Sequence, residues 1–213
     1  MKSMQLSSKD KGHGYPATDL VILAGGEAKR MNGLNKLLQT FDHQIQLLKI
    51  YQQLKHQVNQ VWINSHRDYS TYQRLVPQVK CFKDDEAGFL GPMMGMKSAW
   101  SHVQSDYVLF IPCDVTHIPE DVISNLHALL AQSDACEVAI LEINECALYP
   151  FCLMKRSALP KLRQNLDKNQ RSLKRCFVDM HYKTALIKDD ALFFHSINSL
   201  DELQQYKQLE AIT

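Results

Sequence analysis

The segment Leu20-Val21-Ile22-Leu23-Ala24-Gly25-Gly26 joins a continuous apolar run to two adjacent glycines. A short apolar run without polar alternation is typical of a strand buried on both faces, and such strands occur inside parallel α/β sheets. The glycines carry no Cβ atoms, so backbone N–H groups after the strand can approach a ligand closely. Ligands of open α/β sheets bind at the carboxyl ends of the strands. The segment therefore predicts a nucleotide-phosphate loop at the end of the first strand.

Three basic residues, Lys29, Arg30 and Lys36, follow the glycines within ten positions. A Walker A loop requires Gly-Lys-Ser/Thr, whereas Gly33 is followed by Leu-Asn-Lys, and the Gly-x-Gly-x-x-Gly spacing of dinucleotide-binding loops is also missing. What remains is a Gly-Gly pair followed by Arg-Met and by a lysine ten residues after the second glycine. The alternative interpretation is an ordinary glycine turn with a solvated basic loop.

The chain has 213 residues, which fits one domain with a sizeable core. Its formal net charge of +1 provides no overall field that would attract nucleic acid or an anionic membrane. No apolar segment reaches the roughly 20 residues that span a bilayer. The polar start has no signal-peptide core, so we expect a flexible tail over residues 1–17 and one domain over residues 18–213.

Six cysteines are spread along the chain without a Cys-x-x-Cys pair. Disulfide frameworks and zinc sites both require tighter clustering. We therefore expect reduced thiols in a cytoplasmic protein.

Apolar runs that suit strands alternate with segments of helical periodicity. The predicted strands are 20–24, 61–63, 79–82, 107–111, 138–141, 151–154, 185–187 and 193–195. The predicted helices are 45–58, 68–75, 94–103, 119–130, 158–166, 172–180 and a last helix opened by the capping box Ser199 to Glu202. This alternation predicts an α/β protein, a single Rossmann-like three-layer domain with a mainly parallel, mixed sheet.

Polar residues follow three of these predicted strands: the Gly25-Gly26 loop, Asp84 and Asp114. Because parallel strands end at one edge of a sheet, the three groups are expected to share a crevice. A nucleoside triphosphate requires cations, N–H donors and Mg²⁺ held by one or two carboxylates. Lys36 and Arg30 are the candidate cations and Asp114 is the candidate metal ligand. The alternative for Asp114 is a turn or cap residue.

The pattern resembles the molybdenum cofactor guanylyltransferases, a family of the nucleotidyltransferase group. The resemblance spans about residues 19–210. It rests on Leu23-Ala24-Gly25-Gly26 with Arg30, Met31 and Lys36; on Val61-Trp62-Ile63-Asn64; on Asp84 with Gly91-Pro92 and Gly95; and on Pro112-Cys113-Asp114 before Ile118-Pro119.

The resemblance implies the residues that bind GTP, namely Leu23, Ala24, Gly25, Lys36, Asn64, Asp84 and Asp114, with Gly26 in the same loop. It also implies Mg²⁺ on Asp114, and pterin contacts near Pro150 and Asn198. The implied reaction transfers GMP from GTP to molybdopterin and releases pyrophosphate. The expected partners are these two substrates and, transiently, proteins of cofactor biosynthesis or molybdoenzyme maturation.

The chain departs from the family pattern at two positions of the loop: Asn32 replaces a glycine, and Asn35 replaces an aspartate before the lysine. Activity is still expected, because a phosphate nucleophile needs no protein base and the Asn35 amide oxygen can accept a hydrogen bond from Lys36. Two alternatives remain open. One is a related enzyme that uses CTP or another phosphorylated acceptor, and the other is a catalytically inactive nucleotide-binding homologue.

Overall fold

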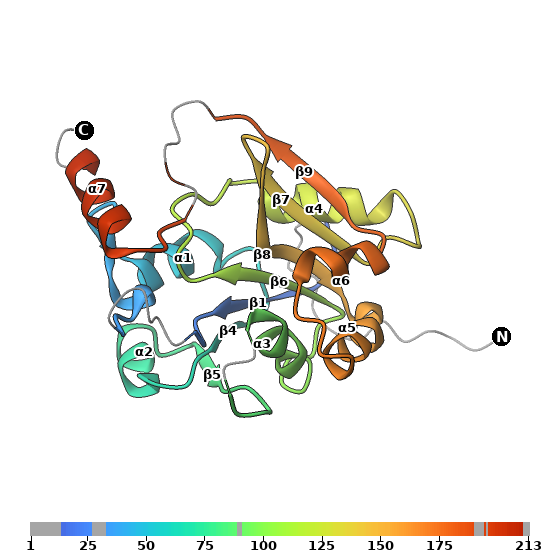
Figure 1. The fold of residues 1–213 in the computed structure, drawn as a ribbon. Coiled ribbons are helices and arrows are strands. Elements are labelled where there is room, and N and C mark those ends of the chain that lie inside the picture. The colour runs from blue at the N-terminus through green and yellow to red at the C-terminus, as the bar shows by residue number, and fades with distance from the viewer. Residues whose placement is uncertain (1–13, 27–32, 89–90, 190–193, 195, 211–213) are drawn as a thin grey trace.

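The computed structural model describes residues 14–26, 33–88, 91–189, 194 and 196–210. Within these ranges a seven-stranded sheet carries helices on both faces, beside a small two-stranded hairpin (Figure 1). The strands of the large sheet are β1 (Thr18–Leu23), β4 (Val61–Asn64), β5 (Lys80–Phe82), β6 (Tyr107–Pro112), β7 (Val138–Ile143), β8 (Cys146–Lys155) and β9 (Lys183–Ile187). The hairpin is β2 (Thr40–Phe41) and β3 (Gln44–Ile45).

The helices of the two faces are α1 (Gln46–Leu54), α2 (Tyr69–Leu75), α3 (Pro92–Ala99), α4 (Val122–Ala131), α5 (Leu159–Asp167) and α6 (Leu173–Asp179). A further helix, α7 (Leu200–Glu210), lies apart from the sheet. Two short 3₁₀ helices are η2 (Lys36–Leu38) and η3 (Arg156–Ala158).

The strand order of the large sheet is β5-β4-β1-β6-β8-β7-β9. β1 runs parallel to both of its neighbours, and Leu23 is aligned with Asn64 of β4 and with Pro112 of β6. β8 runs antiparallel to β6 and β7, and β9 is parallel to β7. The prediction of one α/β domain with a mainly parallel, mixed sheet is therefore confirmed.

The side chains of β1 alternate between two cores, as strand geometry requires. Leu20 and Ile22 pack into the core covered by α1, α2 and α4. Val21 and Leu23 pack into the core covered by α3, α5 and α6. These last three helices lie in front of the sheet in Figure 1. The continuous apolar run of β1 is thus explained by burial on both faces, and the predicted three layers are confirmed.

The hairpin of β7 and β8 is longer than its apolar residues suggest. Its turn lies at Asn144 and Glu145, which both have positive φ angles of 49° and 64°, and the strands pair up to it. Glu142, Asn144 and Glu145 interrupt the apolar pattern towards the turn, so the apolar runs 138–141 and 151–154 cover only part of the paired strands, although Ile143 and Leu148 are buried as well. The strand predicted at 193–195 lies largely outside the described residues.

The C-terminal segment returns to the sheet edge near the end of β6. A single β-bridge joins Val115 to Ser196. A small core then anchors α7 through Phe41, Ile197 and Leu203. Ser199 makes the expected helix-start contact, because its Oγ accepts from the Glu202 N–H at 3.1 Å. The Glu202 carboxylate accepts from the Asn198 N–H at 2.6 Å, one residue before the Ser199 N–H that a capping box would use.

Tyr15, which lies in the expected N-terminal tail, contacts the domain body. Its ring stacks on His127 of α4 with centroids 5.0 Å apart, and its hydroxyl donates to the Gln57 carbonyl oxygen at 3.0 Å. Contact with the domain therefore begins before Thr18, whereas residues 1–13 lie outside the described part of the chain. Among the helices of that described part, none has the length and apolar character needed to cross a bilayer.

His127 provides a test of this packing, because burial lowers its pKa from the ordinary 6.5 to about 4. The Thr18 hydroxyl donates to the Pro16 carbonyl, so the His127 Nε2–H donates to the Thr18 oxygen at 2.8 Å. Between pH 6.5 and 4 the unfolded chain binds a proton that the folded chain excludes, so stability falls as pH falls. We expect His127 to account for a loss of about 2 kcal/mol in unfolding free energy between pH 7 and pH 5.

Urea unfolding at the two pH values measures this loss. His127→Phe should remove that part of the pH dependence, whereas His56→Gln, at an exposed position, should retain it. An equal pH dependence in wild type and His127→Phe would show that His127 is not the group responsible.

Candidate active site

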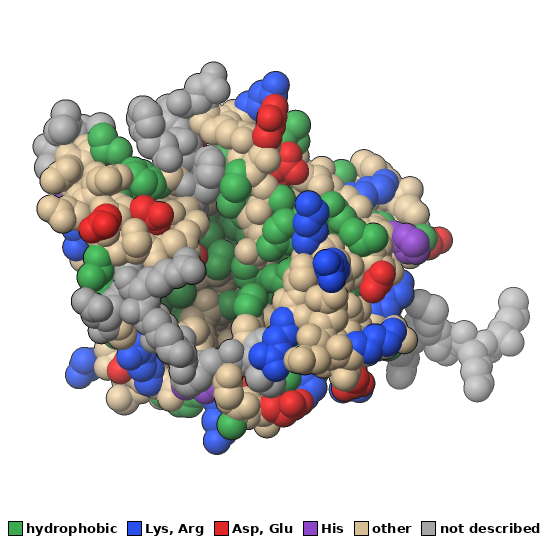
Figure 2. Space-filling view, viewed as in Figure 1, with side chains coloured by type: hydrophobic (Ala, Val, Ile, Leu, Met, Phe, Trp, Pro, Cys, Tyr) green, Lys and Arg blue, Asp and Glu red, His purple; other side chains and the backbone are tan. Residues whose placement is uncertain are grey.

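The carboxyl ends of β1, β4 and β6 open into one cavity of about 360 Å³, a volume in the range of small-molecule sites. The molecule is hollowed on the face over these strand ends, and hydrophobic side chains form part of the wall (Figure 2). The cavity is lined by Leu23, Ala24, Gly25, Gly26, Leu34, Asn35, Lys36, Asn64, Arg67, Asp84, Gly91, Pro92, Pro112, Cys113, Asp114 and Pro150.

On one side of the cavity, Lys36 and Asp114 form an ion pair. The Lys36 Nζ lies 2.7 Å from the Asp114 Oδ2, and the two side chains are 14% and 15% exposed. Lys36 begins η2, whose next residue, Leu37, is fully buried in the core. The cation and the carboxylate predicted from the sequence therefore meet, although 78 positions separate them in the chain.

The backbone around Asp114 is held from two directions. The Cys113 N–H donates to the Leu23 carbonyl at 3.2 Å, which ties the segment to the end of β1. The Asp114 carbonyl accepts from the Ile197 N–H at 3.0 Å, which ties it to the C-terminal segment. These contacts fix the position of the Asp114 carboxylate at the cavity.

On the other side of the cavity, Asp84 receives two hydrogen-bonding groups. The Asn64 Nδ2 donates to the Asp84 Oδ1 at 2.8 Å, and the His66 Nε2 lies 3.1 Å from the Asp84 Oδ2. Asp84 is only 8% exposed and Asn64 only 3%. The carboxylate is thus held in a fixed orientation at the cavity wall.

The Asn64 side chain occupies space that is open only because two neighbouring residues are glycines without a Cβ atom. A Cβ on Gly25 would lie 2.9 Å from the Asn64 Oδ1, and a Cβ on Gly95 would lie 2.4 Å from the same atom. Any larger residue at Gly95 must displace Asn64 or the helix. The requirement for glycine at these positions is therefore the close approach of β1 and α3 to a buried amide.

Cys113 lines the cavity beside Asp114, and its surroundings disfavour the thiolate form. Burial, aided by the nearby Asp114 charge, raises the pKa of its thiol to about 12. Because only the thiolate is nucleophilic, the side chain remains a protonated core group at neutral pH. The interpretation of Cys113 as a core residue fits this environment.

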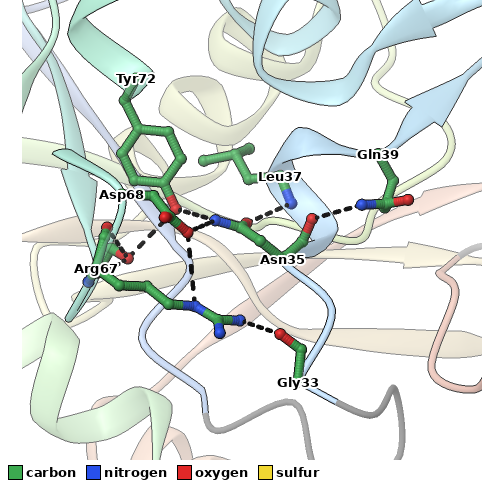
Figure 3. A network of polar contacts seen from close by, with 8 residues as sticks. Gly33, Asn35, Leu37, Gln39, Arg67, Asp68 and Tyr72 are labelled. Carbon is green, nitrogen blue, oxygen red and sulfur yellow. Dashed lines mark hydrogen bonds and ion pairs between the residues drawn. The ribbon is translucent and has the colours of Figure 1, made fainter. Parts of the chain in front are cut away.

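Asn35 does not contact the Lys36 ammonium, contrary to the sequence-based expectation. Its Oδ1 instead accepts from the Leu37 N–H at 3.1 Å, and its Nδ2 donates to Asp68 at 2.6 Å and to the Tyr72 hydroxyl at 2.8 Å (Figure 3). The short 3₁₀ helix turns the Asn35 side chain towards α2 and the Lys36 side chain towards Asp114. The orienting partner of Lys36 is therefore Asp114.

Eight residues singled out from the sequence line this cavity: Leu23, Ala24, Gly25, Gly26, Lys36, Asn64, Asp84 and Asp114. Arg30, the second predicted cation, lies outside the described residues. Arg67 also lines the cavity and was not predicted, although it comes only three positions after the end of β4. A search of the residues that follow each predicted strand would have found it.

The residues at the Lys36 side of the cavity suit a magnesium ion better than a metal held wholly by protein. Within the described residues, no group of three or more His, Cys, Asp and Glu side chains gathers in a way that could hold a metal. Mg²⁺ is commonly held by one or two carboxylates together with substrate phosphates and water. Asp114, beside the glycine loop, meets that requirement.

The domain has a nucleotidyltransferase-type fold, which it shares with solved structures of other proteins. It matches molybdopterin-guanine dinucleotide biosynthesis protein A of Archaeoglobus fulgidus with a TM-score of 0.65 at 16% identity, over 92% of this chain and all of that one. It also matches a CMP:2-keto-3-deoxy-manno-octonic acid synthetase complexed with CTP, with a TM-score of 0.66 at 15% identity, over 92% of this chain and 99% of that one. At such low identity these matches establish the fold alone.

The sequence narrows the class to a family. Residues 20–184 match the MobA-like NTP transferase domain, and the chain belongs to that family. A protein of Acinetobacter baumannii named molybdenum cofactor guanylyltransferase is 63% identical over 198 residues, covering 93% of this chain and 95% of the relative. A Pasteurella multocida protein of the same name is 37% identical over 185 residues, covering 86% and 96%. The resemblance inferred from the sequence motifs is confirmed.

The fit between Gly95 and Asn64 can be tested by folding stability. Glycine to alanine inside a helix normally stabilises by about 0.5–1 kcal/mol. We expect Gly95→Ala instead to lower the unfolding free energy by about 1–3 kcal/mol, because the new Cβ overpacks against the Asn64 amide. Chemical denaturation of Gly95→Ala, Asn64→Ala and the double variant measures the coupling. The double variant should lose clearly less than the sum of the two single losses, and simple additivity would contradict the contact.

Proposed function

We propose that this chain is a molybdenum cofactor guanylyltransferase, which transfers GMP from GTP to molybdopterin and releases pyrophosphate. The observation that carries the proposal is the single cavity in which a glycine loop and the Lys36–Asp114 pair lie on one side and the Asn64–Asp84 pair on the other. The 63% identical relative of that name supports the choice of substrates.

The reaction is a displacement at phosphorus. An oxygen of the terminal phosphate of molybdopterin attacks the α-phosphorus of GTP and forms the new P–O bond. The bond from the α-phosphorus to the bridging oxygen breaks, and its electron pair leaves with pyrophosphate. The nucleophile is already anionic at neutral pH, so the protein contributes positioning and charge neutralisation rather than a base.

Lys36 and Asp114 act on the triphosphate. The Lys36 ammonium neutralises phosphate charge, and the Gly25-Gly26 backbone supplies N–H donors at close approach. Asp114 would hold Mg²⁺, which when bound supplies further neutralisation of the phosphate oxygens. Because the two side chains lie beside one another, both would act on the same part of the substrate.

Asp84 is suited to recognise guanine. The N1–H and N2 amine of guanine are donors, and a carboxylate has about four acceptor positions. Asn64 and His66 occupy one position on each oxygen of Asp84, so the carboxylate, which lines the cavity, keeps acceptor capacity for a base. Cytosine presents an acceptor at its ring nitrogen and would place it against this negative charge. The fixed carboxylate therefore favours GTP over CTP.

The acceptor side of the cavity includes Pro150 of β8. We place molybdopterin at this end. The family resemblance assigns Asn198, an exposed residue of the C-terminal segment, to the pterin-binding region as well. The six cysteines are all free thiols, which suits a reducing cytoplasm. We also propose that the chain transiently contacts proteins that supply or receive the cofactor.

Nucleotide selectivity is the first test of this function. We expect Mg-GTP to raise the melting temperature more than Mg-CTP, Mg-ATP or Mg-UTP, since a ligand that binds only the folded state stabilises it. Thermal-shift titration at equal ligand concentrations measures the ranking. A larger shift with CTP would move the proposal to a cytidylyltransferase.

The Lys36–Asp114 pair is the second test. Lys36→Ala should weaken Mg-GTP binding by roughly ten- to a hundredfold, the usual effect of one lost charge-assisted contact. Asp114→Asn should reduce Mg²⁺-dependent pyrophosphate release far more than it lowers the melting temperature. Calorimetry and a coupled pyrophosphate assay measure the two effects.

The matched control is Lys161→Ala, which removes a lysine from another ion pair, 2.6 Å from Glu137, on α5 outside the cavity. It should leave GTP affinity unchanged. Undiminished GTP affinity in Lys36→Ala would remove Lys36 from the binding site, and an Asp114→Asn variant that only unfolds would make Asp114 a structural turn residue.

A further inference from the structure

Asn35 is the centre of a polar network that joins the end of the glycine loop to the segment before α2 (Figure 3). Its Nδ2 donates to the Asp68 Oδ2 at 2.6 Å and to the Tyr72 hydroxyl at 2.8 Å. Its Oδ1 accepts from the Leu37 N–H at 3.1 Å and so caps η2. The side chain thus donates through one end and accepts through the other, which a neutral amide can do and an ionised carboxylate cannot.

This network fixes the backbone on both sides of Lys36. Asn35 ties the start of η2 to α2, and Leu37, with no exposed surface, ties the next residue to the core. The Asn35 carbonyl also accepts from the Leu38 N–H at 3.1 Å. Lysine has a flexible side chain, so the position of its Cα limits where its ammonium can reach. The Lys36 ammonium reaches Asp114 from a backbone that is held at both neighbours.

The network also holds Gly33, where the loop that begins at Gly25-Gly26 ends. The Arg67 Nη2 donates to the Gly33 carbonyl at 2.6 Å, and its Nε lies 3.7 Å from the Asp68 Oδ2. Asp68 therefore faces one neutral amide and one guanidinium that already has a partner in the loop. A carboxylate at position 35 would face the Asp68 carboxylate at hydrogen-bond distance, with the half-exposed Arg67 as the nearby cation.

We propose that Asn35 is a positioning residue for Lys36, and that the Asp68 carboxylate requires a neutral amide at position 35 for the phosphate side of the cavity to form. The chain runs from Asn64 directly to Asp68 and Tyr72. This one segment therefore holds Asp84 through Asn64 on one side of the cavity and supports Lys36 through Asn35 on the other. The role of Lys36 on phosphate rests on the proposed function, whereas the dependence of position 35 on position 68 stands on the contacts alone.

A charge-exchange experiment tests the proposal. Asn35→Asp should weaken Mg-GTP binding and lower the turnover of pyrophosphate release, each by at least about tenfold, because two carboxylates then share one site. Asp68→Asn should have a small effect, since its amide oxygen still accepts from Asn35. The double variant Asn35→Asp/Asp68→Asn exchanges donor and acceptor and should recover binding and turnover to within about threefold of wild type.

The control for an asparagine-to-aspartate change is Asn125→Asp, at an exposed position of α4, which should bind Mg-GTP as wild type does. Calorimetry is performed on each folded variant, so that loss of affinity is separated from loss of stability. A general structural defect at position 35 would not be repaired by a second change at position 68, and recovery in the double variant is therefore specific to the proposed pair.

If Asn35→Asp does not fold, adding Asp68→Gly to it tests the proposal. Asp68 has a positive φ of 62° and makes no capping hydrogen bond through its side chain to α2, so glycine suits its backbone. Asn35→Asp/Asp68→Gly lacks the opposing carboxylate and should fold and bind Mg-GTP. Failure of this variant would overturn the proposal, as would wild-type affinity in Asn35→Asp or no recovery in the charge exchange. A wild-type chain that binds no Mg-GTP would instead overturn the proposed function.

Discussion

The parallel pairing of β1 with β4 and β6 is the constraint on which the rest of the structure depends. Leu23 is aligned with Asn64 on one side and with Pro112 on the other, so three segments leave the sheet at one edge. Burial of β1 on both faces holds this alignment, because a slip by one residue would exchange its two apolar faces. The cavity is a direct consequence of that register.

The two sides of the cavity are built by different physical means. The Lys36–Asp114 side is held by opposite charges and by a 3₁₀ helix anchored at Leu37. The Asp84 side is held by close packing, since the Asn64 amide fits between two glycines. Charge placement tolerates small displacements, whereas the space between the Asn64 amide and the two glycines is too small to admit even one added Cβ. Phosphate binding and base recognition should therefore respond differently to mutation.

The reversed strand β8 brings the second half of the chain to the same site. Because β8 is antiparallel to β6, Pro150 lies two residues beyond the pair of Phe110 and Cys152, near the end of β6. The C-terminal segment arrives there as well, through the hydrogen bond from Ile197 to Asp114. One edge of the sheet thus collects residues from the beginning, middle and end of the chain.

The sequence alone determined the elements whose pattern is local. The alternation of apolar runs with segments of helical periodicity was sufficient to predict the three-layer fold, and the family resemblance added expected roles for Lys36, Asn64, Asp84 and Asp114. Periodicity records burial, and these strands are buried along most of their length. The length of the β7–β8 hairpin was underestimated because Glu142, Asn144 and Glu145 interrupt its apolar pattern near the turn, although Ile143 and Leu148 are buried there.

Only the tertiary structure decided which polar groups meet. Asn35 is adjacent to Lys36 in sequence, yet η2 turns the two side chains apart, towards Asp68 and Asp114 respectively. Both partners lie more than 30 positions away, and no local pattern encodes a contact at that separation. The need for glycine at position 95 likewise comes from Asn64, a residue of another element. Hydrogen bonds and close contacts of this kind depend on the distance between elements, which the packing of the whole core sets.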